Sequence, residues 1–194
     1  MKDIFLINKP NDYLVIVNKK NRLPKEYIPS DLELINPNYS DSKQYLRIKA
    51  KQAFESMAKD IEKINLKIIA VSTYRSYEYQ EKLFNNYVKE KGLKYANRCS
   101  AKAGYSEHQT GLAVDIANKN LDYDNFDKTD EFNWVKDNAH KYGFIMRYPE
   151  NKEDITGYKY EPWHYRYVGD IATYIYNNNL TFEEYKKINE KTSI

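Results

Sequence analysis

The chain is short of several residue types, and each shortage excludes a class of protein. It has a single cysteine, Cys99, in 194 residues, so neither an internal disulfide framework nor redox chemistry is expected. No apolar run approaches the roughly 20 residues that a membrane-spanning helix needs. Positive and negative charges nearly balance, with 31 Lys and Arg against 28 Asp and Glu, and the basic residues are scattered. Nucleic acid is therefore not an expected partner.

A chain of this length, with no repeat and no linker, is expected to form one domain over residues 1–194. Residues 1–40 break apolar pieces such as DYLVIVN with Pro and Asn, which predicts one or two strands and then an irregular wrapping segment. Residues 170–194 are expected to form a helical tail. The N-terminus has no signal-peptide pattern. We expect a cytoplasmic protein if Met1 is the native start, and a cell-envelope protein if a leader or anchor was removed. The oligomeric state stays open.

Hydrophobic spacing predicts helices over residues 43–64, 77–91 and 129–143, the second ended by Gly92 and the third capped by Thr129 or Asp130. Runs rich in β-branched or aromatic residues predict strands over 66–76, 111–117, 144–148 and 163–169. Residues 93–106 are expected to be a loop. Helices and short strands that do not alternate regularly indicate the α+β class.

Two of the few histidines stand in conspicuous segments, His108 in SEHQTGLAVDI and His164 in EPWH. In a continuous strand His108 and Asp115, seven residues apart, would face opposite sides. They can reach one site only if the chain turns between them, and Thr110 followed by Gly111 is where a turn is easiest. A carboxylate in an apolar strand is costly unless it meets a cation, which can be a metal ion or an Arg or Lys side chain.

Glu161 lies three residues before His164, and the proline between them restrains the backbone, so that both side chains can flank one cleft. A catalytic zinc takes three protein ligands and keeps one position open, and His108, Asp115 and His164 are a chemically apt set. Such a site also needs a base that is not a ligand, a role that suits Glu161. Trp163 can form a wall of the cleft.

A further segment, STYRSYEYQ, places Arg75 at the end of a predicted strand and Gln80 on the next helix. Arg75 could hold a carboxylate or an oxyanion, with Gln80 supporting the substrate, although a surface ion pair is an open alternative for Arg75. His140 has no carboxylate at ligand spacing, so we interpret it as structural. Cys99 and Glu107 are expected to take no part in the chemistry.

Taken together, the segments TYRSYEYQ, SEHQTGLAVDI, YGFIMRYP and ITGYKYEPWHYRYVG resemble the VanY-type D-alanyl-D-alanine carboxypeptidases, zinc enzymes of peptidoglycan metabolism. The resemblance spans residues 34–169. It implies a small, mainly antiparallel sheet flanked by helices, as in the hedgehog and D,D-peptidase folds. One departure is Ala103 before Gly104, where relatives commonly carry proline, so that the approach loop is expected to be less rigid.

The same resemblance implies a role for each candidate residue. Zn²⁺ is the implied cofactor, and Glu161 the implied base. Arg75 would stabilise the tetrahedral intermediate. The implied metal ligands are His108, Asp115 and His164, and the implied substrate-binding residues are Ser106, Gln80 and Trp163.

The implied reaction is removal of the C-terminal D-alanine from pentapeptide stems or precursors of peptidoglycan. The shared motifs leave open an L,D-carboxypeptidase acting on tetrapeptide stems, a D,D-dipeptidase and a bifunctional glycopeptide-resistance enzyme. A stem-cutting endopeptidase is a further alternative, although such proteins usually carry a wall-binding domain. A non-enzymatic alternative is a wall-binding module that keeps the metal, but such a module would be expected to have lost the base.

Overall fold

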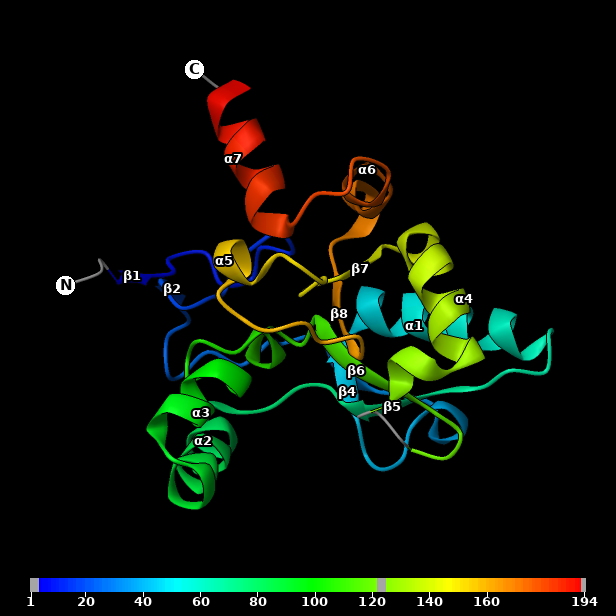
Figure 1. Cartoon of the computed structure of the whole chain (residues 1–194), viewed down its shortest axis with the longest axis horizontal. Helices are drawn as coiled ribbons and strands as arrows, with labels where there is room; N and C mark the ends of the chain where they lie inside the picture. The colour runs from blue at the N-terminus through cyan, green and yellow to red at the C-terminus, as the bar shows by residue number, and fades with distance from the viewer. Residues whose placement is uncertain (1–3, 122–124, 193–194) are drawn as a thin grey trace.

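The computed structural model describes residues 4–121 and 125–192. In chain order its strands and α-helices are β1 (Phe5–Leu6), β2 (Asn21–Arg22), β3 (Leu32–Leu34), β4 (Tyr45–Arg47), α1 (Ile48–Glu62), β5 (Ile68–Ser72), α2 (Tyr77–Lys91), α3 (Leu93–Cys99), β6 (Ala113–Asn118), α4 (Asp130–Asn138), β7 (Phe144–Met146), α5 (Glu153–Thr156), β8 (His164–Tyr167), α6 (Ala172–Asn177) and α7 (Phe182–Thr192). Figure 1 shows their arrangement.

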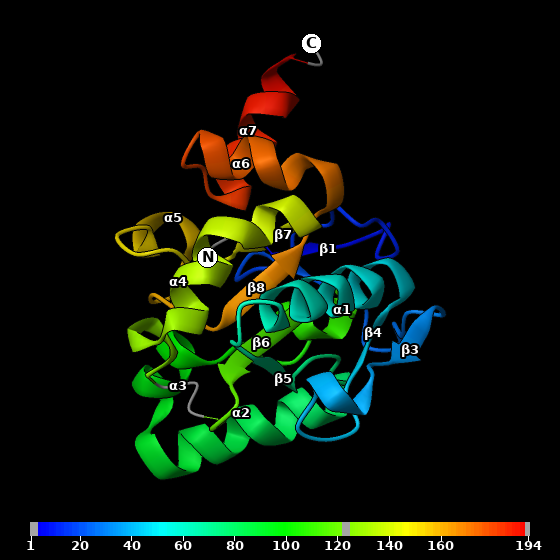
Figure 2. The same ribbon diagram turned by 90° about the vertical axis from the view of Figure 1, so that its right-hand side faces the viewer.

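The centre of the fold is a four-stranded sheet with the strand order β5-β6-β8-β7, in which every neighbouring pair is antiparallel. Helices surround this sheet, with α1 and α4 close to it and α2 and α3 lying together at one end of the molecule (Figure 2). The α+β prediction, with a small antiparallel sheet flanked by helices, is confirmed. No helix in the part of the chain that the structure describes is long and apolar enough to cross a membrane.

The two faces of the sheet have different chemistry because side chains alternate along a strand. On β6, Val114 and Ile116 enter the main core, where they meet apolar side chains of α1, α4 and β8. Asp115 lies between them in sequence and therefore points to the opposite face. The main core consists of Ile35, Leu46, Ala50, Phe54, Met57, Ala58, Ile61, Ile68, Ala70, Leu112, Val114, Ile116, Phe126, Phe132, Val135, Ala139, Phe144 and Tyr165.

A second, smaller core joins the C-terminal helices to the sheet. Ile145 of β7 and Val168, just after β8, pack with Ala172 and Ile175 of α6 and with Phe182 at the start of α7. Helical structure was predicted over 170–194, and α6 and α7 lie in that range. That residues 1–194 form one domain, with a wrapping segment and a tail, stays a prediction.

Strands were predicted within residues 1–40, and β1, β2 and β3 lie there, but the apolar piece DYLVIVN is not one of them. Val15 and Val17 are buried, as the apolar pattern suggests, but the segment pairs with no strand. Instead, the backbone carbonyls of Tyr13 and Val15 accept hydrogen bonds of 3.0 and 2.9 Å from the guanidinium of Arg166. An arginine therefore satisfies these buried backbone groups in place of a neighbouring strand.

Two other boundaries differ from the prediction. The helix predicted over 43–64 begins at Ile48, because Tyr45–Arg47 form β4 and pair with Leu32–Leu34. The loop predicted over 93–106 contains α3, which buries Ala96 and packs against α2. Gly92 ends α2 with a φ of 82°, and Thr129 caps α4 by accepting a hydrogen bond from the backbone N–H of Phe132 at 3.1 Å, both as predicted.

Candidate metal centre and active site

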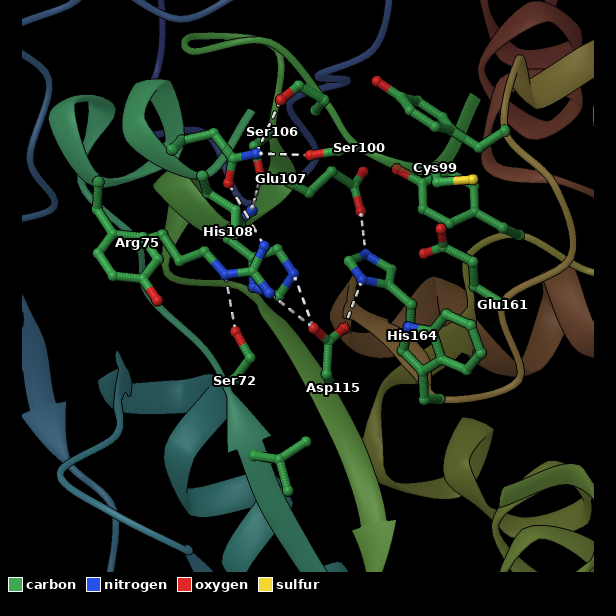
Figure 3. A pocket seen from close by; sticks show the side chains of 18 of the residues that line it. Ser72, Arg75, Cys99, Ser100, Ser106, Glu107, His108, Asp115, Glu161 and His164 are labelled. Carbon is green, nitrogen blue, oxygen red and sulfur yellow. Dashed lines mark hydrogen bonds and ion pairs between the residues drawn. The ribbon is translucent and has the colours of Figure 1, made fainter. Parts of the chain in front are cut away.

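One cavity of about 420 Å³ gathers the residues that the sequence singles out. It lies where β5 ends, beside Asp115 of β6 and His164 of β8 (Figure 3). Its lining includes all of the candidates, namely Arg75, Gln80, Ser106, His108, Asp115, Glu161, Trp163 and His164. Their roles stay predictions, but the fold brings them to one place.

Strand pairing places two of the predicted metal ligands side by side. Asp115 of β6 is the register partner of His164 of β8, so both side chains leave the sheet on the same face. Nδ1 of His164 lies 2.9 Å from Oδ1 of Asp115. The pairing joins positions 49 residues apart in the sequence.

The third predicted ligand reaches this pair through a turn. His108 lies in a short 3-10 turn, Glu107–Thr110, and Gly111 then takes a left-handed conformation with a φ of 65° before β6 begins at Ala113. The predicted break between His108 and Asp115 is therefore confirmed. Nε2 of His108 lies 3.3 Å from Oδ2 of Asp115. One donor atom from each of the three residues lies within 4.8 Å of the others, and all three residues are buried.

The second nitrogen of each imidazole is also engaged. Nδ1 of His108 lies 2.6 Å from the backbone carbonyl of Thr73, and because a carbonyl only accepts, Nδ1 carries the hydrogen. Nε2 of His164 lies 3.4 Å from Oε2 of Glu107. Each ring thus directs its remaining nitrogen to the shared centre. Hydrogen bonding of the outer nitrogen to a carbonyl or a carboxylate is the usual way in which metal-binding histidines are oriented. Two imidazoles and a carboxylate are a donor set that fits zinc.

Burial and neighbouring charges shift the pKa values of the two histidines in opposite directions. Burial, together with the charge of Arg75, lowers the pKa of His108 to about 4, so its ring is neutral. Burial also lowers the pKa of His164, but hydrogen bonds to Asp115 and Glu107 outweigh it and raise that pKa to about 9. Burial opposes ionisation of Asp115 too, yet the facing imidazoles hold its pKa well below the usual range. Near neutral pH Asp115 is therefore ionised, the ring of His108 is neutral and the ring of His164 carries a proton.

Glu161 lies beside this group with a different environment. It is buried, and burial, reinforced by the charge of Asp115, raises its pKa to about 7 although His164 acts in the opposite direction. Among the residues that the structure describes, none donates a hydrogen bond to its carboxylate. A carboxyl group with a pKa near neutrality is suited to taking and returning a proton.

Arg75 closes the centre from the side of β5. Its Nη2 lies 3.0 Å from Oδ2 of Asp115, and its Nε donates to Oγ of Ser72 at 2.8 Å. Its Nη1 donates to Oε1 of Gln80 at 3.4 Å, and the amide of Gln80 in turn donates to the carbonyl of Ala101 at 2.8 Å. An ion pair was an open alternative for Arg75 and for Asp115, and the structure shows that the two residues pair with each other.

Glu107, expected to take no part in the chemistry, contacts one of the proposed metal ligands. It lines the cavity, is fully buried and faces His164. Its Oε1 accepts hydrogen bonds from Arg147 at 2.7 Å and Arg166 at 2.9 Å, which holds its pKa well below the usual range against the effect of burial. Arg147 and Arg166 each stand in an apolar strand pattern and each need a counter-charge, but the pattern does not indicate which carboxylate supplies it.

Three other side chains complete the description. Cys99, given no role, lines the cavity. Tyr148 was also missed, and its ring stacks on that of His164 with centroids 4.9 Å apart. His140 lies outside the cavity, where it stacks on Tyr176 at 4.1 Å and contacts Oγ1 of Thr173 at 3.2 Å, so its structural interpretation fits.

Comparison with known proteins identifies the family. The family model VanY, D-alanyl-D-alanine carboxypeptidase, matches residues 43–170. The chain belongs to the VanY family. A Bacillus subtilis (strain 168) protein named as a carboxypeptidase, YodJ, is 46% identical to this VanY-family chain over 187 residues, which cover 92% of the chain and 68% of YodJ. The chain spans 56% of the length of a related D-alanyl-D-alanine carboxypeptidase of Enterococcus faecium.

Two solved structures extend the likeness to the whole fold. The LD-carboxypeptidase LdcB is 44% identical, with a TM-score of 0.89, and the match covers 95% of this chain and 90% of LdcB. The vancomycin-resistance D,D-pentapeptidase VanY, solved in complex with Zn(II), is 33% identical, with a TM-score of 0.77, covering 90% of this chain and 99% of that one. The family prediction made from the motifs is confirmed.

Proposed function

We propose that this protein is a zinc-dependent carboxypeptidase that removes the C-terminal D-alanine from peptidoglycan stem peptides. The observation that carries the proposal is the buried group of His108, Asp115 and His164 beside Glu161, in a chain of the VanY family. A zinc ion held by these three side chains would act as a Lewis acid toward the scissile carbonyl and make water nucleophilic at neutral pH.

The remaining steps fall to side chains of the protein. The carboxylate of Glu161 takes a proton from the attacking water and returns it to the departing amine, which a pKa near 7 allows in both directions. Arg75, held in place by Ser72 and Gln80, stabilises the negative charge that develops on the carbonyl oxygen. Ser106, Gln80 and Trp163 line the same cavity and would hold the terminal D-residue.

Replacement of the base tests the mechanism. Glu161→Gln removes the proton acceptor but none of the proposed ligands, so we expect zinc content to stay at the wild-type level while turnover falls about 10²- to 10⁴-fold. His164→Ala should instead lose zinc. Elemental analysis and release of D-alanine measure the two properties separately. Wild-type turnover in Glu161→Gln would refute the assignment of the base.

The bond that is cut distinguishes two candidate reactions. The family resemblance makes D,D-cleavage of a pentapeptide the first expectation, whereas the closer likeness to LdcB, at 44% identity against 33% for VanY, favours L,D-cleavage of a tetrapeptide. We therefore rank the tetrapeptide as the first substrate to test. Mass spectrometry of the products from a tetrapeptide, a pentapeptide and free D-Ala-D-Ala separates these reactions from a dipeptidase in one assay. A protein that binds zinc but cleaves none of the three would fit the wall-binding alternative.

A further inference from the structure

A buried group of charges lies directly behind the proposed metal centre. Glu107 uses its two oxygens in different directions, Oε1 toward Arg147 and Arg166 and Oε2 toward Nε2 of His164. The side chains of Glu107 and both arginines are fully buried. A carboxylate held by two guanidiniums has little freedom to move, so it fixes the imidazole that donates to it.

The second carboxylate of this group comes from α7. Arg147 donates from Nη1 to Oε2 of Glu183 at 2.7 Å and from Nη2 to Oε1 at 2.5 Å, while its Nε donates to Glu107. One guanidinium thus bridges the two carboxylates with all three of its nitrogens. With Arg166 included, two positive charges face two negative charges, and the buried group is neutral only if Glu183 is present.

The first turn of α7 is fixed at this place by packing as well as by charge. Phe182 is fully buried, and its ring centroid lies 5.7 Å from the guanidinium carbon of Arg147 and 5.5 Å from that of Arg166. Asn18 of the N-terminal segment also donates to Oε1 of Glu183 at 3.4 Å. α7 lies at one end of the molecule (Figure 1) and outside residues 43–170, which the family model matches.

We propose that Glu183 is a positioning residue for the metal centre, acting through Arg147 and Glu107 on the ring of His164. The inference rests on the proposed zinc site. Glu183 holds the guanidinium of Arg147, Arg147 and Arg166 hold Glu107, and Glu107 keeps Nδ1 of His164 directed at the centre. Without the charge of Glu183, the arginines are left with one positive charge in excess, and Glu107 is drawn toward them and away from the imidazole.

The test is the zinc affinity of Glu183→Gln, measured on the metal-free protein by competition with a chromogenic chelator. Removal of a residue that contacts a metal ligand weakens metal binding by roughly 10- to 100-fold. Glu183 lies two contacts beyond such a residue, Glu107, so its replacement should weaken zinc binding by about threefold to tenfold. Glu184→Gln is the matched control, because it makes the same change on the same helix but pairs with Lys152 at 3.2 Å. Its zinc affinity should equal that of the wild type.

A double-mutant cycle distinguishes positioning from general stability. If Glu183 acts through Glu107, Glu183→Gln should not weaken zinc binding further in a protein that already carries Glu107→Gln. The losses of unfolding free energy in the two variants can still add. Glu183→Asp keeps the charge and should restore part of the affinity, which also provides a folded variant if Glu183→Gln is unstable. Each protein is unfolded in urea without metal, so that stability is measured separately.

The outcomes separate the two proposals. Equal zinc affinities for Glu183→Gln, Glu184→Gln and the wild type would refute the positioning role and leave the proposed function intact. Additive losses in the cycle would show that Glu183 acts by another route and would also refute it. A wild-type protein that binds no zinc would refute the proposed function itself.

Discussion

His164 lies between the proposed metal centre and the buried charges behind it. Nδ1 lies 2.9 Å from Asp115, Nε2 lies 3.4 Å from Glu107, and the ring of Tyr148 covers its face. A ring with a carboxylate at each nitrogen has two chemical states, a protonated one that pairs with both carboxylates and a neutral one that donates to only one of them. A metal ion bound at Nδ1 requires the neutral state.

This requirement predicts how zinc affinity depends on pH. In the metal-free protein the pKa of His164 is raised to about 9, so the ring carries a proton at pH 7 that zinc must displace. Since one proton leaves for each zinc that binds, affinity should rise about tenfold per pH unit between about pH 7 and 9 and then level off. Competition titrations in buffered chelator measure it. A constant affinity over that range would contradict the protonated state of the metal-free ring.

The candidate residues could be predicted from the sequence because some belong to a residue type that is rare in the chain, and others are charged residues in an apolar segment, where burial costs free energy. Only three histidines exist in the chain, and Asp115 breaks an apolar strand pattern. Glu107 could not be found in this way. Nothing local indicates that Arg147 and Arg166, 40 and 59 residues further along, converge on its carboxylate. A buried ion pair between distant segments depends on the tertiary fold, which local patterns do not encode.

At the scale of elements, the site depends on one turn and one strand register. Hydrophobic spacing predicted the helix and strand types, and Gly111 indicated the break before β6, but neither indicated that Asp115 pairs with His164. The register of a non-local antiparallel pair follows from the packing of both faces and from the connections between strands. The apolar piece DYLVIVN is not a strand for a related reason. Its pattern indicates burial, but it does not indicate that Arg166 satisfies the carbonyls of Tyr13 and Val15 in place of a strand partner.

The turn at Gly111 should tolerate no larger residue. In Gly111→Ala the new Cβ would lie 2.7 Å from Cδ2 of Leu32 and 3.0 Å from Cγ of Arg47, at a φ of 65°. The left-handed backbone and the overpacking together should cost roughly 2 to 4 kcal/mol of unfolding free energy. Gly169→Ala is the control, since its φ is also 65° and the nearest atom to its new Cβ, Oη of Tyr167, lies 3.9 Å away. It should lose only about 1 to 2 kcal/mol.

Urea unfolding of the metal-free variants gives both values. Gly111→Ala should also weaken zinc binding, because the same turn directs His108 to the centre, whereas Gly169→Ala should not. If the two variants lost the same free energy, contact with Leu32 and Arg47 would not constrain the turn.

At the scale of the molecule, the two segments outside the matched family domain meet behind the site. The N-terminal segment offers the carbonyls of Tyr13 and Val15 to Arg166, and α7 offers Glu183 to Arg147. These contacts satisfy guanidinium donors that would otherwise be buried without partners. A buried donor without a partner costs more free energy than the net contribution of one hydrogen bond. The support of the proposed metal centre thus extends beyond residues 43–170, which the family model matches.

Zinc should therefore stabilise the whole protein against heat. The proposed ligands come from the 3-10 turn before β6, from β6 and from β8, so metal binding joins segments that must separate on unfolding. At a free zinc concentration about 100-fold above the dissociation constant, the gain is roughly 2.7 kcal/mol, which corresponds to about 5 to 10 °C in Tm for a chain of this size. Calorimetry before and after treatment with a chelator measures the shift, and added zinc should restore it. Asp115→Ala, which lacks one proposed ligand, should show a smaller shift or none. An identical Tm for the zinc-loaded and metal-free wild-type protein would mean that zinc does not bind the folded state through these three residues.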